Sequence, residues 1–453
     1  MSELTPNKTW LFKKPPTTLP MPGINTAIED RPLRLISPPG GLVMRLLIAG
    51  FDPHQRDRMR EPSALDYVPC YEIDEPISSF SIGQVIRSNH ERFVEGSLIA
   101  GLLPISQYGV IPGEMIDIGD AAAPILWRVT NDYNLDLKHY VGTLGLAGMT
   151  AWNSFYGLVK PVSGETIWIN AASSSVGQLV VQLAKIEGMR VIASVSSDDK
   201  LDYVLNELGA DVGFNYRQEP IQDALKRLAP DGLDVVFDNI GGDHFQAAIE
   251  NMKWFGRIIC CGMASQYNQP VNKSYGVTNL GEIVRRRIKI QGFVYSDENI
   301  FGNVDNFWKT VPRWISEGKI KSRYTEFEGI KNVDQAFISM FTGGSFGKTI
   351  VRINDLKDLA KAIAAGLTSN YSNAPTKPEE WWQISLMYTA LIDYWALTGD
   401  DQYNAMTKQN IVGQIASKSD FMSANQTSYK TNSEQASWAL AAMNAAEAGL
   451  DSS

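Results

Sequence analysis

The N-terminal part of the chain alternates short apolar runs with turns rich in glycine and proline. Between residues 25 and 136, runs such as Gly41–Gly50 and Phe80–Ile86 are short, β-rich and bounded by turn-forming residues. Many short strands separated by turns are typical of an antiparallel sheet that closes toward a barrel. We therefore expect a barrel-like domain in this part of the chain.

From about residue 137 the pattern changes to alternating strands and helices. Glu165–Ala172 has the pattern of a strand, and the apolar residues after it recur at helical spacing, namely Val176, Leu179, Val180, Leu183 and Ile186. Further strand patterns follow at Arg190–Val195, Leu233–Phe237 and Arg257–Cys260, with a helical pattern around His244–Met252. Alternating units of this kind require a parallel sheet covered by helices.

The pattern changes again near Asn354, after the strand-like run Lys348–Ile353. Of the 37 glycines in the chain, only Gly366, Gly399, Gly413 and Gly449 lie in 354–453, which also lacks arginine. Alanine-rich sequence with aromatic residues at helical spacing favours an all-α segment. The chain is thus expected to consist of an α/β part followed by a helical part.

Composition limits the partners and the location that this chain can have. The 453 residues carry 41 Lys+Arg and 50 Asp+Glu, a formal net charge of −9, which argues against nucleic acid and anionic membranes as partners. The three cysteines, Cys70, Cys260 and Cys261, offer no spaced pair for a metal cage and fit a reducing compartment. No secretory signal follows Met1 and no run of about 18 apolar residues predicts a membrane span. We expect a cytoplasmic protein.

The turn at Ala171–Gly177 is the first candidate for chemistry. A turn between the first strand and helix of such a unit lets a pyrophosphate approach backbone amides at a helix N-terminus. Only Gly177 is a glycine here, because serines occupy 173–175, so the turn alone leaves a plain strand–loop–helix connection open. The next strand ends at Ser194–Lys200, which contains Asp198, Asp199 and Lys200, so spacing alone does not separate NAD from NADP.

Six motifs in order carry a resemblance to a known family. They are Leu144–Trp152, Ala171–Gln178, Ser197–Lys200, Phe214–Tyr216, Phe237–Gly242 and Cys261–Asn268, flanked by Phe51–Arg56 and Gly347–Val351. Over residues 8–353 the chain resembles the zinc-independent medium-chain dehydrogenase/reductases, specifically the prostaglandin and leukotriene reductases and alkenal double-bond reductases. The resemblance implies an α/β fold with a GroES-like β-barrel substrate domain (1–136, completed by 301–353) and a Rossmann doubly wound parallel sheet (137–300).

The resemblance also implies NADP(H) as cofactor and a small enone or enal as substrate, whose C=C bond is reduced. It implies that Lys200 and Tyr216 hold the 2′-phosphate and that Ser174, Val176 and Gly177 form the phosphate turn. The side chains expected at the nicotinamide end are Asn239, Cys261, Gly262, Ser265, Tyr267, Phe293, Tyr295 and Ser345. Relatives commonly form dimers through the edge of the Rossmann sheet, which places Arg285–Arg287 near a possible homodimer interface.

Two side chains are candidates for catalysis. Hydride transfer to the β-carbon leaves enolate charge on the carbonyl oxygen, and that charge needs a positioned donor. Tyr267 is the first candidate, because a phenol can donate to this oxygen; a buried structural tyrosine is the alternative. His54 is the second, since it stands where the family usually has a substrate-facing tyrosine. No metal site is expected, because no cysteine is placed with a histidine nearby.

Several departures from the family pattern leave a second hypothesis open. Ser174 replaces a close-approach glycine, Ser345 replaces a cofactor-contacting asparagine, Ala147 replaces a proline, and Ser97 replaces an acidic residue. Because several of these changes surround one cofactor, the alternative is a degenerate, non-catalytic protein that acts as an interaction module.

Residues 354–453 resemble glycoside hydrolase family 76, the endo-α-1,6-mannanase-like enzymes. That family has two consecutive catalytic aspartates, and here the stretch reads Asn432-Ser-Glu-Gln435, so one carboxylate is missing and the other is Glu434. A glycosidase needs two carboxylates. Mannan hydrolysis is therefore the less favoured alternative, and the Asn425–Thr427 sequon is expected to be unused. We expect a helical remnant that exposes Trp381, Trp382 and Trp395 and either docks on the reductase or is poorly ordered.

Overall fold

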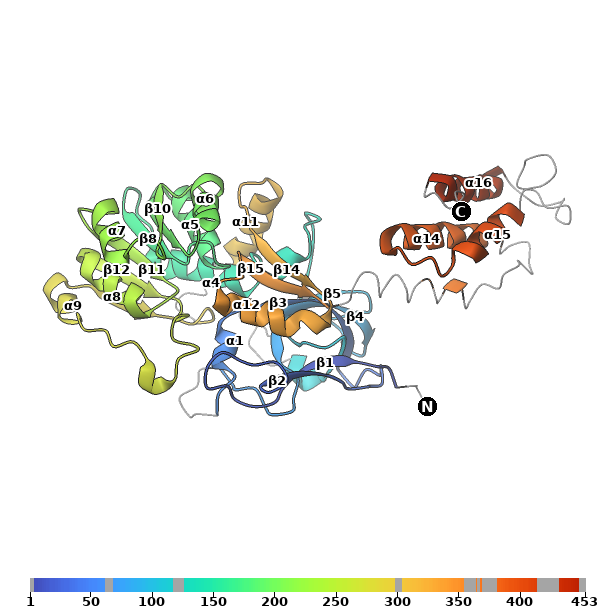
Figure 1. Ribbon diagram of the computed structural model, residues 1–453, viewed down its shortest axis with the longest axis horizontal. Helices are drawn as coiled ribbons and strands as arrows, with labels where there is room; N and C mark the ends of the chain where they lie inside the picture. Colours follow the sequence, from blue (N-terminus) through green and yellow to red (C-terminus); the bar gives the residue numbers. More distant parts are fainter. Residues whose placement is uncertain are drawn as a thin grey trace. The chain divides into compact units, whose positions relative to one another are not determined.

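The computed structural model shows a chain of two compact units, Met1–Ile353 and Asn354–Ser453 (Figure 1). The described residues are 4–61, 68–116, 126–297, 304–353, 364, 367–368, 381–413 and 432–447.

A largely antiparallel sheet forms the barrel-type part of the larger unit. Its long central strand is β3 (Leu42–Phe51), which is buried at eight of its ten positions because both of its faces are covered. The last strand of the unit, β15 (Lys348–Arg352), pairs with β3, so the end of the unit completes a sheet that begins near the N-terminus. The order is β14 (Tyr324–Glu328), β15, β3, β4 (Ser78–Ser88), β5 (Leu98–Pro104) and β7 (Leu126–Arg128), with β6 (Tyr108–Ile111) also on β3 and a separate pair β1 (Lys8–Phe12) and β2 (Thr26–Asp30).

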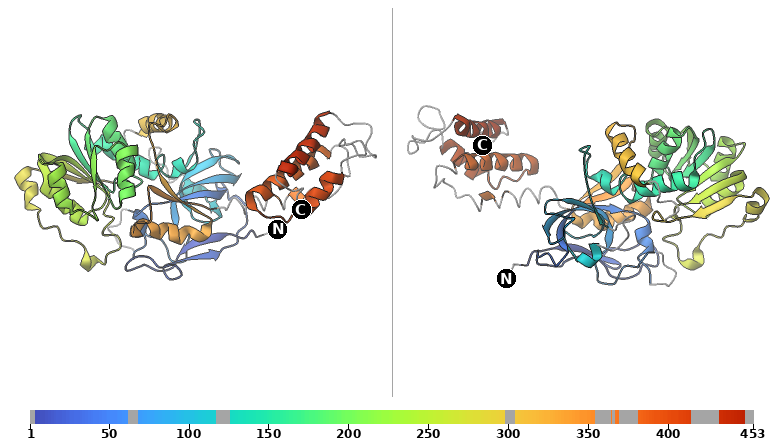
Figure 2. Two further views of the ribbon diagram at one scale, coloured as in Figure 1. Left: turned by 45° about the horizontal axis from the view of Figure 1, so that its top comes forward. Right: turned by 180° about the vertical axis from the view of Figure 1, so that it is seen from behind.

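Six parallel strands form the second sheet. Their order is β10 (Val212–Asn215), β9 (Arg190–Val195), β8 (Thr166–Asn170), β11 (Leu233–Asp238), β12 (Met252–Cys260) and β13 (Lys289–Gly292). This is the doubly wound order of nucleotide-binding sheets, in which the strand order reverses between β8 and β11. Helices cover both faces of the sheet (Figures 1 and 2). The predicted α/β fold class is confirmed.

The helices follow the apolar spacing read from the sequence. The stripe between residues 176 and 186 forms α5 (Gly177–Ile186), where Leu179, Val180 and Leu183 are buried against the sheet. Among the described helices, none is both long and apolar enough to cross a membrane. The other helices in the described residues of the larger unit are α1 (His54–Asp57), α2 (Gly113–Ile116), α3 (Lys138–Val141), α4 (Leu146–Ser154), η1 (Phe155–Val159), α6 (Asp198–Asp202), η2 (Tyr203–Glu207), α7 (Ile221–Leu228), α8 (Gly242–Asn251), η3 (Val271–Lys273), α9 (Gly281–Arg286), α11 (Val304–Ser316), η4 (Ile330–Asn332) and α12 (Val333–Thr342).

In its described part the smaller unit consists mainly of α14 (Trp381–Thr398), α15 (Asn404–Gly413) and α16 (Asn432–Glu447), which pack against one another (Figure 2). The rings of Tyr388 and Trp438 are buried between them, with centroids 5.8 Å apart. Trp395 is half-buried. The Asn425 sequon and the side chains of Trp381, Trp382 and Glu434 lie outside the described residues. Docking or poor order of this unit stays a prediction.

Candidate functional site

The carboxyl ends of β8, β9, β11 and β12 meet at one edge of the parallel sheet. Ligands of open α/β sheets bind at this edge, close to the point where the strand order reverses. The segments that follow the four strands are 171–177, 196–200, 239–242 and 261–268, and they contain most of the residues that the sequence selected. The fold therefore brings these residues to one place.

The turn at 171–177 is tightly built and tied to the barrel-type sheet. The Ser174 hydroxyl accepts a hydrogen bond from the Gly177 amide (3.1 Å). A Cβ on Gly177 would lie 2.4 Å from the Ala171 carbonyl oxygen, so only glycine fits there. Ser174 also forms an isolated β-bridge with Gly347, whose amide donates to the Ser173 carbonyl (3.0 Å). Serine at 174 is thus accommodated in the turn, and its hydroxyl binds the amide of the first residue of α5.

Two further residues of this turn, Ser175 and Val176, lie directly before α5. The Ser175 hydroxyl oxygen is buried and has no hydrogen-bond partner, which is unusual for a buried polar atom. Val176 occupies the N-cap position of α5 and is half-buried. The turn therefore holds an unsatisfied hydroxyl at the N-terminal end of an apolar helix.

Lys200 is a buried lysine without a carboxylate partner. Its exposed fraction is 8%, and its Nζ donates to the Ser196 hydroxyl and the Gly343 carbonyl, both at 3.4 Å. Among the described residues this ammonium forms no ion pair, although the charge of the neighbouring Asp199 attracts it. Burial lowers the pKa of Lys200, because desolvation opposes its charge. An anion bound here would offset that cost.

Arg217 adds a second cation at the same corner, and the sequence had not selected it. Its Nη2 lies 3.0 Å from the position of a Cβ on Gly343, the residue whose carbonyl also accepts from Lys200. Its charge contributes to the lowered pKa of Lys200. Tyr216, the preceding residue, is half-buried and packs edge-on against the His244 ring (5.0 Å).

The carboxylates near this corner are already engaged. Asp198 accepts from Asn215 Nδ2 (2.9 Å) and Gln218 Nε2 (2.8 Å), and Asp199 accepts from the Ser197 hydroxyl. These hydrogen bonds lower the pKa of both carboxyl groups. The two aspartates therefore stay ionised and point to donors of their own chain.

Of the residues predicted for the nicotinamide end, Asn239 follows β11 and Cys261, Gly262, Ser265 and Tyr267 follow β12, whereas Phe293 and Tyr295 follow β13 and Ser345 precedes β15. Asn239 Nδ2 donates to the Asn170 carbonyl (2.8 Å), and the Cys261 and Gly262 amides donate to the Asp238 carbonyl. Ser265 Oγ donates to the Ile240 carbonyl (2.7 Å). Phe293, Tyr295 and Ser345 are half-buried, and burial raises the pKa of Tyr295. These contacts anchor the 261–268 loop beside the sheet edge.

The two candidate catalytic side chains come from different parts of the larger unit: Tyr267 lies in the loop after β12 and His54 lies at the start of α1. The Tyr267 hydroxyl accepts a hydrogen bond from the Met263 amide (3.1 Å) within its own loop. His54 begins α1, two residues after Asp52, which forms a buried ion pair with Lys348 (2.6 Å). Burial lowers the pKa of His54, so its imidazole is neutral near pH 7. A hydrogen bond from Arg56 Nε to Asn268 Oδ1 (2.9 Å) joins the two segments.

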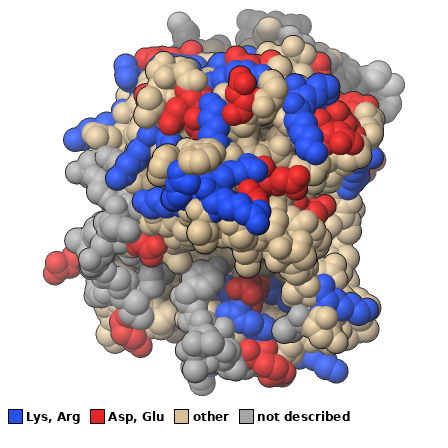
Figure 3. Space-filling model, turned by 90° about the vertical axis from the view of Figure 1, so that its left-hand side faces the viewer, with Lys and Arg blue, Asp and Glu red and all other residues tan. Residues whose placement is uncertain are grey.

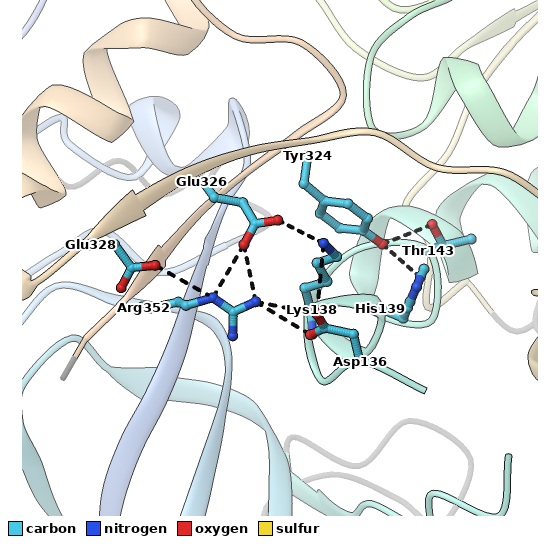
Figure 4. A network of polar contacts seen from close by, with 8 residues as sticks. All are labelled: Asp136, Lys138, His139, Thr143, Tyr324, Glu326, Glu328 and Arg352. Carbon is cyan, nitrogen blue, oxygen red and sulfur yellow. Dashed lines mark hydrogen bonds and ion pairs between the residues drawn. The ribbon is translucent and has the colours of Figure 1, made fainter. Parts of the chain in front are cut away.

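A polar network connects the start of the Rossmann part with β14 and β15 (Figure 4). Arg352 bonds to Glu326 (3.1 Å) and Asp136 (3.4 Å), and Lys138 bonds to Glu326 (2.8 Å). Beside it, the Tyr324 hydroxyl meets His139 Nδ1 at 3.1 Å. Burial lowers the pKa of His139 to about 4 and raises that of Tyr324 to about 12. The network fixes the two parts of the larger unit against each other.

An exposed apolar surface is formed by the N-terminal part of β12 and by α9, which precedes the edge strand β13. The exposed fractions of Trp254, Phe255 and Val284 are 64%, 69% and 78%. The guanidinium of Arg287 stacks over the Trp254 ring at 4.0 Å, and Lys and Arg side chains gather on this side of the molecule beside uncharged surface (Figure 3). Phe255 has a φ of 62°, a strained conformation for an aromatic residue.

The cysteines at the sheet edge are not arranged as reactive thiols. Burial raises the pKa of both Cys260 and Cys261 to about 12, so both stay protonated at neutral pH. Within the described ranges, no group of three or more His, Cys, Asp or Glu side chains is placed to hold a metal ion.

Three family models match this chain. The model described as N-terminal domain of oxidoreductase matches residues 8–118, and that described as zinc-binding dehydrogenase matches residues 175–311. The model of glycosyl hydrolase family 76 matches residues 330–453, beginning inside the larger unit.

Curated relatives and solved structures cover the larger unit. Dehydrogenase FUB6 of Gibberella moniliformis is 73% identical over 350 residues, 77% of this chain and 98% of that protein. NADP-dependent oxidoreductase RED1 of Cochliobolus heterostrophus is 40% identical, over 77% of this chain and 98% of that protein. CurA from Vibrio vulnificus, solved alone and in complex with NADPH, has a TM-score of 0.68 and 25% identity over 77% of this chain and 99% of its own.

Proposed function

This chain belongs to the zinc-independent branch of the medium-chain dehydrogenase/reductases, and on that premise we propose that it reduces the C=C bond of an α,β-unsaturated aldehyde or ketone with NADPH. It is an NADP-dependent oxidoreductase by family. Among its relatives, a 2-alkenal reductase of Nicotiana tabacum is 32% identical over 78% of this chain and 99% of that protein, which supports the finer proposal.

The observation that carries the proposal is the corner beside the phosphate turn. The buried, unpaired Lys200, the neighbouring Arg217 and the unsatisfied Ser175 hydroxyl all suit phosphate groups. Asp198 and Asp199 are held by donors of their own chain, so neither is directed to a ribose 2′-hydroxyl. This arrangement favours NADPH over NADH. We assign the 2′-phosphate to Lys200, Tyr216 and Arg217, and the pyrophosphate to Ser174, Val176 and Gly177.

The nicotinamide end is assigned by its place at the ends of β11 and β12. The residues proposed to line it are Asn239, Cys261, Gly262, Ser265, Tyr267, Phe293, Tyr295 and Ser345. When bound, the cofactor supplies the hydride for the β-carbon. The chain's own side chains then have to orient the substrate and stabilise the charge on its oxygen.

Tyr267 is proposed to donate a hydrogen bond to the substrate carbonyl oxygen. The Tyr267 hydroxyl accepts a hydrogen bond from the Met263 amide. This hydrogen bond polarises the O–H group and makes it a better donor. His54, which burial keeps neutral, is proposed as a second donor through a ring N–H. Neither role needs a metal ion.

The test begins with NADPH binding, followed by fluorescence, and continues with NADPH oxidation against a panel of enones and enals. The expected result is saturable binding and turnover of at least one enone. Tyr267→Phe should lower turnover while NADPH binding persists, because the phenol contributes nothing to the phosphate corner. No binding at millimolar NADPH would overturn the proposal and leave the degenerate interaction module.

Ser174→Gly tests the same alternative. Since Ser174 is accommodated in the turn, we expect little change in NADPH affinity. A large gain would show that serine at this position restricts the cofactor. Mannan hydrolysis by residues 354–453 is supported only by the family 76 match, and sugar release that survives removal of 1–353 would be needed to establish it.

We also infer a homodimer through the β13 edge and a reducing compartment such as the cytoplasm. The exposed Trp254 and Phe255, with Phe255 in a strained backbone conformation, present apolar area beside that edge. The free thiols of Cys70, Cys260 and Cys261 suit a reducing environment.

A further inference from the structure

Arg56 connects the two segments that carry the candidate catalytic side chains. It lies on α1, two residues after His54, and its Nε donates to Oδ1 of Asn268, the residue after Tyr267 (2.9 Å). Its Nη2 donates to the carbonyls of Pro16 and Thr18, both at 2.9 Å. One side chain thus spans from the barrel-type part to the loop at the Rossmann edge.

The support behind Arg56 is rigid. Asp52 is fixed by the buried ion pair with Lys348 and by a hydrogen bond from its amide to Gln55 Oε1 (2.8 Å). Two residues beyond Arg56, Arg58 donates to the Pro69 carbonyl (2.9 Å) and the Ser78 hydroxyl (3.2 Å). Because both ends of this short helix are anchored, Arg56 can hold a partner in a defined position.

The partner loop is anchored unevenly. Its first half is held by the Rossmann main chain, through Cys261 to Asp238 (2.8 Å) and Ser265 to Ile240 (3.1 Å). At its far end, next to Tyr267, Asn268 is held by Arg56 from the other part of the unit. The position of Tyr267 therefore depends on a contact between the two parts.

The side chain of Arg56 is suited to holding the loop through hydrogen bonds rather than to filling space in the core. Its exposed fraction is 6%, and its acceptors are three neutral oxygens rather than a carboxylate. Burying a cation costs free energy that an apolar residue of similar size would not, and the charge of Asp57 offsets only part of that cost. Only the forked guanidinium reaches three acceptors in different directions at once.

We propose that Arg56 is a positioning residue, which holds the 261–268 loop through Asn268 so that Tyr267 faces the substrate carbonyl. The inference rests on the proposed reductase function for its catalytic consequence. Its structural content is independent of that function: the loop end should loosen whenever this hydrogen bond is removed.

The test uses Asn268→Ala, Arg56→Lys and the double variant in the full chain, with Arg87→Lys on the exposed surface as control. Each single variant should lower kcat for an enone about tenfold, because a displaced donor stabilises the enolate poorly. The Kd for NADPH should change less than about twofold, since the phosphate corner is not touched. The double variant should be no worse than either single one, because both remove the same bond.

Hydrogen exchange in the cofactor-free protein supplies a readout without turnover. Exchange at 263–270 should be faster in both single variants and unchanged in α5 and in the control. Additive losses in kcat, or unchanged exchange at 263–270, would overturn the inference. If the native chain neither binds NADPH nor reduces an enone, the proposed function fails, and exchange alone still decides whether Arg56 holds the loop.

Discussion

At the scale of single residues, the phosphate corner shows how burial and charge combine. Lys200 is desolvated and the charge of Asp199 offsets only part of that cost, whereas Arg217 beside it is exposed. A phosphate would relieve the cost at Lys200 and the repulsion between the two cations. The two side chains should therefore contribute unequally to cofactor choice.

We expect Lys200→Ala to weaken NADPH binding by about tenfold to a hundredfold, the range for a hydrogen bond to a charged group, and to leave NADH binding nearly unchanged. Arg217→Ala should also weaken NADPH binding, but by less than Lys200→Ala does, because the Arg217 guanidinium is exposed. Fluorescence titrations with both cofactors measure the ratio. Arg227→Ala is the matched control, since Arg227 lies on α7 and pairs with Glu219. Equal losses for NADH and NADPH would contradict the assignment.

Single residues also show which parts of the candidate site can be predicted from the sequence. Lys200 and Tyr216 could be selected from ordered motifs, because each follows a strand of the parallel sheet. Arg217 could not be selected, because in the sequence it does not differ from any solvated arginine. Only the fold shows that it lies beside Gly343, a residue far along the chain. In the sequence, Ser174 is a departure from the glycine of the family pattern. The structure accommodates it through a β-bridge with Gly347. The assignment of cofactor-binding and catalytic roles stays a prediction.

At the scale of elements, α3 and β14 are in contact through a half-buried histidine, His139. The pKa of His139 is lowered from 6.5 to about 4, so below pH 6.5 the unfolded chain binds a proton that the folded chain does not. Folding stability is therefore lost as the pH falls from about 6.5 to 4, by up to about 3 kcal/mol.

His139→Gln removes this titration, and calorimetry of the larger unit should then show a smaller decrease in thermal midpoint between pH 7 and 4.5. At pH 7 the variant should be less stable than the native chain, because the ring contact with Tyr324 is lost. His90→Gln, a histidine outside the network, serves as control. An unchanged acid slope in His139→Gln would assign the acid sensitivity elsewhere, for example to His244, whose pKa burial also lowers to about 4.

The β13 edge is the second element with a testable consequence. Trp254→Glu places a charge in the exposed apolar surface, so it should shift a dimer to monomer in light scattering. It should leave the NADPH affinity unchanged, because Trp254 does not belong to the phosphate turn or the Lys200 corner. A native chain that is monomeric at all concentrations would contradict the proposed interface.

Element boundaries explain where sequence patterns fail. The strand predicted at Arg257–Cys260 begins earlier in the structure, at Met252. The sequence pattern missed this first part because exposed residues there interrupt the apolar run. The buried strands β8 and β9 were predicted closely, since continuous apolar runs mark strands covered on both faces. The resemblance implies that 301–353 completes the barrel-like domain, but the pairing of β15 with β3 in particular could not be predicted, because no local pattern encodes a partner so distant in the chain.

At the scale of the whole molecule, the two units should separate under a protease. Limited trypsin digestion is expected to cut between Ile353 and α14 before it cuts the larger unit, since the latter has its own extensive core. The fragment that retains residues 1–353 should keep NADPH binding within about twofold, because the proposed ligands all lie in it. Loss of binding on cleavage would show that the helical unit supports the reductase.

The position of β15 also constrains the order of events during synthesis. Gly347 closes the phosphate turn and Lys348 secures the α1 segment, so neither can be complete until the ribosome has made the last strand of the larger unit. Domains fold as units as they emerge. While the residues after Ile353 are being made, β15 can pair with β3, which completes the 171–177 turn and the α1 segment during synthesis.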